Sequence, residues 1–332
     1  MSIRVPASEI DWFARVIGTD GYLREERNYK LLAHKVVSAL LADQTLARPD
    51  FPGLLADVLS ADAPDLEALG LDAGDRREVD RLLKESDVVS FKGALANLAG
   101  GRWGPVQFVW IPRAVEFGLG EELRGAFRAL VDPGDPVSER VDRFRDDLYA
   151  VQQRLQEKGG FLPKWHLLRV SLNFVGALLG AYDPGAYTFY AYGALRRAFE
   201  DFGGEWPRGT AGERYAAVCA FVAAVADALR EGGVPVQDLI DAQSFIYIRS
   251  IEAPRRAGAP VGMPGAAPAV EAVDRETVTK DLAQAIGWPL ERARKLVNMA
   301  TRWRQLLFQG PPGTGKTYVA ETLARLLTGD EE

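Results

Sequence analysis

Lys316 and Thr317 are the residues whose types and spacing most clearly indicate chemistry. They close the octapeptide Gly-Pro-Pro-Gly-Thr-Gly-Lys-Thr at residues 310–317, which has the P-loop pattern G-x-x-x-x-G-K-[ST]. Glycines let such a loop curl round a phosphate, so that successive backbone N–H groups point inward. The lysine can then reach the β- and γ-phosphates, and the threonine hydroxyl can ligate Mg²⁺.

The pattern gives each residue of this loop a role in binding a nucleoside triphosphate with Mg²⁺. We expect Lys316 and Thr317 to act in catalysis, with Thr317 as the metal ligand. The expected contacts to the nucleotide are Gly310, Pro311, Pro312, Gly313, Thr314, Gly315, Lys316, Thr317 and Tyr318. The loop does not distinguish ATP from GTP, because it binds the phosphates and not the base.

A P-loop connects a strand to a helix, and both flanks of this loop have the required pattern. The apolar residues 306–308 predict a short strand, and Ala320, Leu323 and Leu327 recur at helical spacing behind the loop. The start of that helix would place its positive end at the phosphates. The alternative is a glycine-rich turn that binds nothing, and the presence of both flanks argues against it.

A working P-loop NTPase also needs an acidic strand end that holds Mg²⁺ and polarises water. No apolar run ending in Asp-Glu follows the loop before Glu332. We therefore expect the sequence to be the front part of a longer protein. Without the remaining strands, residues 273–332 would pack loosely and bind ATP or GTP weakly or not at all, without turnover.

Composition and charge restrict the class of protein. The 332 residues are 47% hydrophobic, which suggests about two domains with ample core. The net charge of the chain is −6. Residues 273–332 carry nine basic and eight acidic residues, so the remaining residues have a net charge of −7. This negative charge does not favour the binding of a polyanion to the front part of the chain. Cys219 is the only cysteine, so no internal disulfide can form, and with only two histidines besides we do not expect a zinc site. No signal peptide or membrane span is evident, and we expect a cytoplasmic protein.

Hydrophobic spacing divides the sequence into three parts. Residues 1–250 predict a mainly α-helical recognition or regulatory domain, whose clearest helix covers residues 137–158. A capping box at Thr210 and Glu213 predicts the start of another long helix. Residues 102–112 are the exception, because alternating apolar residues between two prolines suggest an extended segment. Residues 251–272 are rich in Ala, Gly and Pro and predict a linker, and residues 273–332 begin the α/β P-loop domain.

One aromatic cluster in the helical part allows two interpretations. Tyr187, Phe189, Tyr190 and Tyr192 are followed by the basic pair at residues 196 and 197. Such a surface could stack on a nucleobase and bind phosphate. The simpler interpretation, which we favour, is a helical corner whose aromatic side chains fill the core. For Cys219 and His166 we likewise favour structural roles over catalytic ones.

The P-loop sequence resembles that of AAA+ ATPases. The wider string, from Thr277 through two predicted helices to Ala324, is similar to the McrB-type branch, the NTPase subunit of modified-DNA restriction systems. The resemblance covers about residues 274–328. It implies a homo-oligomeric ring that hydrolyses ATP or GTP, an endonuclease partner subunit, and DNA binding through an N-terminal domain. Only Gly310–Thr317 match the motif residue by residue.

The sequence thus predicts the first part of an AAA+ P-loop NTPase that drives translocation on DNA, or its remodelling, in a restriction or defence system. The fold expected is a mainly α N-terminal domain followed by an α/β P-loop domain truncated after the helix that the P-loop opens. The alternative function is a helical binding module without catalysis, whose P-loop segment is a remnant or incomplete.

Overall fold

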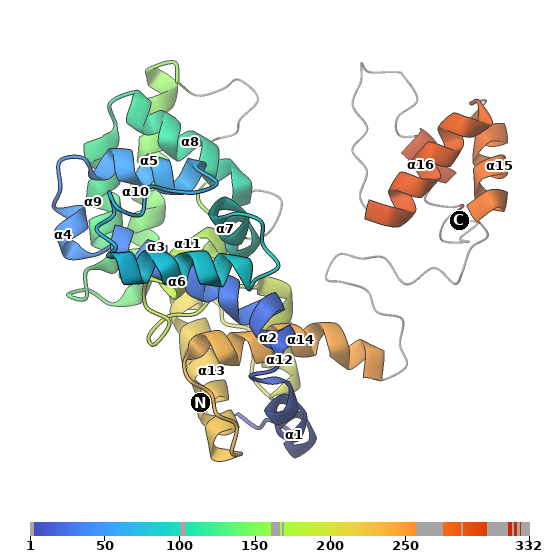
Figure 1. The fold of residues 1–332 in the computed structure, drawn as a ribbon, viewed down its shortest axis with the longest axis horizontal. Helices are drawn as coiled ribbons and strands as arrows, with labels where there is room; N and C mark the ends of the chain where they lie inside the picture. Colours follow the sequence, from blue (N-terminus) through green and yellow to red (C-terminus); the bar gives the residue numbers. More distant parts are fainter. Residues whose placement is uncertain are drawn as a thin grey trace. The chain divides into compact units, whose positions relative to one another are not determined.

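The protein is described here by a computed structural model in which the chain divides into two compact units, Met1–Ser250 and Ile251–Glu332. The structure describes residues 3–99, 104–160, 167, 169–256, 275–286, 288–303, 318–320, 322, 323 and 326. These residues are mostly helical and contain no strand (Figure 1). The strand expected at residues 306–308 lies outside the described part, as do residues 257–272 of the linker expected at 251–272. Residues 251–256 of that expected linker are instead the last turns of helix α14 (Leu239–Arg256).

The helices of the first unit are short to medium in length (Figure 1). Their bounds are α1 Ala7–Val16, α2 Asp20–Tyr22, the π-helix η1 Leu23–Arg27, α3 Asn28–Leu40, α4 Asp43–Leu46, α5 Phe51–Ser60, α6 Ala73–Lys84, α7 Phe91–Ala99, α8 Gly104–Glu116, α9 Gly120–Val131, α10 Val137–Glu157, α11 Leu172–Tyr182, α12 Tyr192–Asp201, α13 Ala211–Glu231 and α14 Leu239–Arg256. The second unit contains α15 Arg275–Ile286 and α16 Leu290–Trp303.

Two long helices confirm the expectation from spacing and capping. In α10 the apolar residues repeat every three or four positions, and Val141, Phe144 and Leu148 are fully buried. Helix α13 begins with the predicted capping box. The Glu213 amide donates to the Thr210 hydroxyl at 3.1 Å, and the Thr210 amide donates to the Glu213 carboxylate at 2.7 Å.

The expectation of an extended segment at residues 102–112 is wrong, because residues 104–116 form α8. Phe108, Ile111 and Ala114 are buried at helical spacing where α8 packs on α5, while Val109 is 53% exposed. The alternation around Trp110 arises because the buried face of α8 is wide enough to include Phe108, Trp110 and Ile111, so burial follows more than one spacing. Pro112 lies within α8 and removes one backbone donor there without ending the helix.

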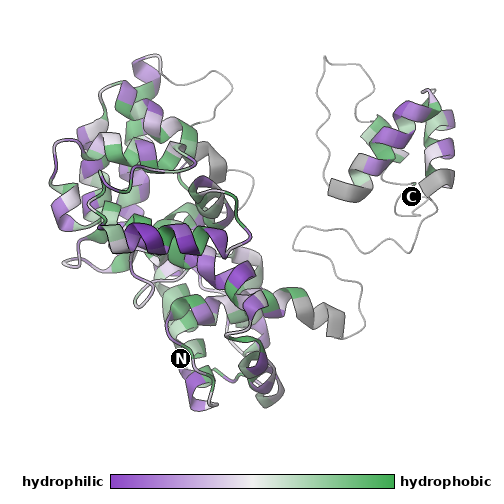
Figure 2. Ribbon diagram, in the orientation of Figure 1, coloured by the Kyte–Doolittle hydropathy of each residue, from purple (hydrophilic) through white to green (hydrophobic). Residues whose placement is uncertain are grey.

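The first unit has one continuous hydrophobic core with two centres of aromatic packing. Helices α5, α8, α9 and α10 pack together in one half, where the rings of Phe127 and Phe144 lie 5.2 Å apart. In the other half α12 and α13 are joined by Phe199 and Phe221, whose rings stack at 3.8 Å. Helix α6 lies at the surface of this unit, and hydrophilic residues form purple bands along it (Figure 2). Its buried residues are Val79 and Leu82.

The second unit is held together by a small core of its own. Val278 and Leu282 of α15 pack against α16, whose buried members include Val297. Val319 and Leu323, from the helical turn after the P-loop, are buried in the same core. The sequence predicts loose packing of residues 273–332 without further strands, but α15 and α16 cover Val319 and Leu323.

Candidate functional site

The P-loop itself, Gly310–Thr317, lies outside the described residues, but the start of the helix behind it is described. Tyr318 is 51% exposed, and its hydroxyl donates to the Ala285 carbonyl at the end of α15 at 3.2 Å. Val319 is 7% exposed and lies in the core formed by α15 and α16. The residues directly after Thr317 are therefore anchored to the helix pair, with the tyrosine ring at the surface.

The remaining candidates for catalysis have structural roles where they are described. Cys219 is buried in α13, and this burial raises the pKa of its thiol to about 11, which keeps it protonated and unreactive. His34 is hydrogen-bonded through Nδ1 to the Ala181 carbonyl at 2.7 Å. His166 lies outside the described part of the chain. No group of three or more metal-ligating side chains occurs among the described residues.

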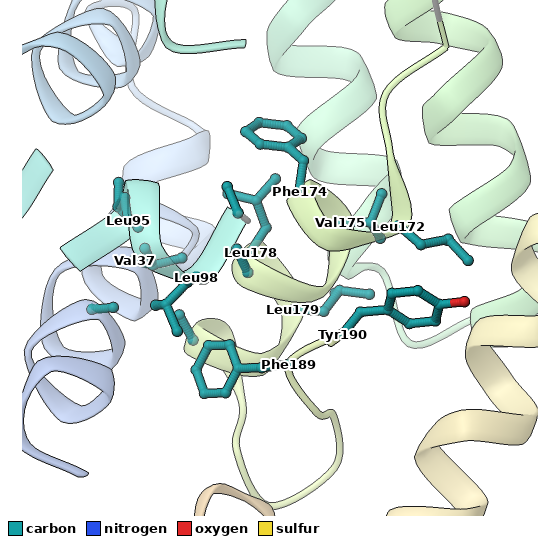
Figure 3. Close-up of a cluster of buried hydrophobic side chains, with 14 of the residues drawn as sticks. Val37, Leu95, Leu98, Leu172, Phe174, Val175, Leu178, Leu179, Phe189 and Tyr190 are labelled. Carbon is teal, nitrogen blue, oxygen red and sulfur yellow. The ribbon is translucent and has the colours of Figure 1, made fainter. Parts of the chain in front are cut away.

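The favoured core interpretation of the aromatic cluster is confirmed for Phe189 and Tyr190, which are 3% and 6% exposed. Their rings point to opposite sides of an extended segment that lies on α11 (Figure 3). The arginines that follow have partners already. Arg196 pairs with Glu200 at 3.0 Å, and Arg197 donates to the Ser250 carbonyl at 3.4 Å. Arg196 also donates to the Tyr192 hydroxyl at 3.1 Å, so both arginines are bound to groups of the protein itself.

The sequence did not predict a basic pocket that Tyr190 lines together with residues from several helices. This cavity of about 650 Å³ is lined by side chains that include Arg145, Arg208, Arg214, Tyr190, Tyr192 and Trp206. They come from α10, from the extended segment before α12, from the start of α12, and from the loop and first turn of α13. No single stretch of sequence carries this signal, since Arg145 and Arg214 are separated by the whole of α11 and α12.

A second cavity of about 310 Å³ lies beside Lys30, whose ammonium group is fully hydrogen-bonded. The Lys30 ammonium donates to Glu26 at 2.7 Å, to Gln243 at 2.8 Å and to the Ser244 hydroxyl at 2.7 Å. An ammonium group has three donors, so all of them are used. This lysine is 2% exposed and tied to α14, which is a structural role.

A neighbouring ionic network joins the beginning and the end of the first unit. Arg27 pairs with Asp238 at 2.9 Å and with Asp241, and the Tyr22 hydroxyl donates to the same Asp241 carboxylate. Burial and the Asp241 carboxylate raise the pKa of Tyr22 well above its ordinary value. Because every member has a partner, this network stabilises the fold and offers no free group for chemistry.

No protein-family model, curated protein or solved structure matches this chain. No helix in the described part of the chain is long and apolar enough to cross a membrane.

Proposed function

We propose that the second unit binds a nucleoside triphosphate with Mg²⁺ through Gly310–Thr317. The observation that carries this proposal is the complete motif G-x-x-x-x-G-K-[ST] with an apolar run before it and an apolar helical pattern behind it. The burial of Val319 and Leu323 against α15 and α16 supports it, because a P-loop needs its helix fixed to a core. The nucleotide is ATP or GTP, and Lys316 and Thr317 contact its terminal phosphates and its metal ion.

The larger system proposed follows from the resemblance to AAA+ ATPases of the McrB type. In that system the chain belongs to a homo-oligomeric ring that hydrolyses ATP or GTP, works with an endonuclease subunit, and acts on DNA. The first unit would supply recognition or regulation through its helical surface. The presence of an open basic pocket in that unit, lined by arginines and aromatic rings, is compatible with such a role.

The metal-dependent part of the proposal is tested by Thr317→Ala. Isothermal titration of the chain with ATP and with GTP, with Mg²⁺ and with EDTA, should show tighter binding when Mg²⁺ is present. The substitution removes the hydroxyl ligand of the metal, so it should weaken binding with Mg²⁺ by about tenfold and leave binding in EDTA nearly unchanged. Equal losses in both conditions would show that Thr317 does not act through a metal ion.

A further inference from the structure

The basic pocket of the first unit differs in charge from the surface around it. Residues 1–272 carry an excess of seven acidic residues, since the chain has a net charge of −6 and residues 273–332 carry +1. Among the described residues that line the pocket, three are arginines and none is a carboxylate. Such a concentration of one charge in an acidic unit attracts an anion.

Arg145 is the most constrained of these arginines. Its Nε donates to the Val170 carbonyl at 2.8 Å, while its two terminal nitrogens have no hydrogen bond to the described residues. Burial lowers the pKa of Arg145, and the guanidinium groups of Arg169 and Arg214 lower it further against the opposing effect of Asp142. The carboxylates of Asp142 and Asp146 do not offset the effect of burial, and a half-buried guanidinium with other guanidinium groups nearby is stabilised further by a bound anion.

The nearest carboxylates are already engaged. Asp142 accepts a hydrogen bond from the Gly212 amide at 2.9 Å, and Asp146 pairs with Arg169 at 2.8 Å. The side chain of Arg214 makes only one hydrogen bond with the described residues, to the Gly209 carbonyl at 3.0 Å, and the side chain of the exposed Arg208 makes none. The pocket therefore has guanidinium donors left for a ligand that has several acceptor oxygens.

Aromatic rings form the other side of the pocket. Trp206 is half-buried, and its ring lies 5.2 Å from Tyr192 and 5.3 Å from Phe199, both in edge-to-face contact. Tyr192 is 47% exposed. The Tyr190 hydroxyl has no hydrogen-bond partner among the described residues, and burial raises its pKa to about 12, so it remains a neutral donor. Partly exposed rings beside free donors suit a planar group that can stack and accept hydrogen bonds.

The local backbone holds this arrangement in place. Gly209 has φ of +105° and lies just before the capping box of α13, which fixes the loop that carries Trp206 and Arg208. Helix α12 begins at Tyr192 without a side-chain cap, so amide groups of its first turn are left for another acceptor. The pocket is thus built from ordered elements and exists before any ligand binds.

We propose that this pocket binds a nucleotide, with the phosphate at Arg145, Arg208 and Arg214 and the base against Trp206 and Tyr192. Its volume of about 650 Å³ falls within the range for small-molecule sites. The same chemistry is offered by a free mononucleotide and by one exposed nucleotide of a single strand. This site is separate in sequence from the P-loop, and its assignment does not depend on the proposed function.

The test uses the full chain carrying Lys316→Ala, so that binding at the P-loop is suppressed. Isothermal titration with nucleoside monophosphates, with inorganic phosphate and with a short oligothymidylate should show saturable binding of the nucleotide ligands. Inorganic phosphate should bind at least tenfold more weakly, because it cannot stack on the aromatic rings. Binding of the monophosphates identifies a free nucleotide as the ligand, and binding of the oligonucleotide alone identifies a single strand.

Matched variants locate the site. Arg145→Gln combined with Arg214→Gln should weaken nucleotide binding at least tenfold, whereas Arg154→Gln combined with Arg230→Gln should leave it within twofold. The control removes the same charge from the far ends of the same helices, α10 and α13. If the first pair impairs folding in circular dichroism, the exposed Arg208→Gln carries the test, with an expected loss of at least threefold.

Three results would overturn the proposal. The first is the absence of saturable binding by any nucleotide ligand. The second is an equal affinity for inorganic phosphate and for the monophosphates, which would indicate an anion site without a base. The third is unchanged affinity in the folded pocket variants.

Discussion

The backbone of Tyr190 lies directly on Gly176 of α11, so closely that a Cβ atom at position 176 would be 2.7 Å from the Tyr190 amide nitrogen. Gly180, one turn later, makes the same kind of approach to Phe189, with a Cβ 2.9 Å from its nitrogen. These two glycines let the extended segment pack on the helix (Figure 3). Tyr190 is thereby placed between the core and the basic pocket.

Gly176→Ala should destabilise the first unit by about 1–3 kcal/mol, because the added methyl group would clash with backbone that cannot rotate away. Gly125→Ala in α9 is the matched control. A Cβ at that position meets nothing within 4 Å, so the change should stabilise the helix by roughly 0.5–1 kcal/mol. Urea unfolding followed by circular dichroism measures both effects, and a stabilising Gly176→Ala would contradict the close approach.

Arg27→Met should cost about 3–5 kcal/mol, because it leaves the carboxylates of Asp238 and Asp241 without their cation. The side chain of Asp241 is 1% exposed, so water cannot replace the guanidinium. Arg81→Met removes an exposed pair with Glu78 at 2.7 Å and should cost under about 1 kcal/mol. Similar losses for the two variants in chemical denaturation would show that the Arg27 network contributes no more than a surface pair.

The first unit should lose stability as the pH rises through the alkaline range. The pKa of the Cys219 thiol is raised by burial to about 11. The contribution of this thiol to the free energy of unfolding is therefore complete below the pKa of the thiol in the unfolded chain, and it is lost as the pH approaches 11. Between about pH 7.5 and about pH 10 the loss from this group is about 2 kcal/mol.

Cys219→Ala isolates that contribution. The free energy of unfolding of this variant should fall less steeply than that of the wild type over the same pH range. The cavity left by the substitution lowers stability by an amount that does not depend on pH, so it does not affect this comparison. An identical pH dependence for the wild type and this variant would show that the thiol does not carry the effect.

Local signals were sufficient to predict most of the helices. The stripe in α10 and the capping box of α13 act over a few residues, and nothing elsewhere in the chain opposes them. The segment around Trp110 was predicted wrongly, because the buried face of α8 is wide and its exposed side carries the apolar Val109 where a polar residue would reveal a helical period. The secondary structure of such a segment is determined by tertiary packing and cannot be predicted from the spacing of apolar residues alone.

The two sites differ in how much of them the sequence shows. The proposed P-loop is one continuous motif, so its expected contacts to a nucleotide follow from the octapeptide alone. The basic pocket depends on how α10, α11, α12 and α13 pack, so Arg145 and Trp206 gave no local pattern. The aromatic cluster was recognised, but the arginines next to it in sequence are not those that face the cavity.

The most direct test of the nucleotide-binding proposal is the affinity of Lys316→Ala for ATP and GTP with Mg²⁺. Removing the ammonium group that contacts the terminal phosphates should weaken binding at least tenfold. Lys295→Ala, which removes the same charge from an exposed position of α16, should leave affinity unchanged. Equal affinities for the wild type and Lys316→Ala would contradict the assignment of Gly310–Thr317 as a P-loop.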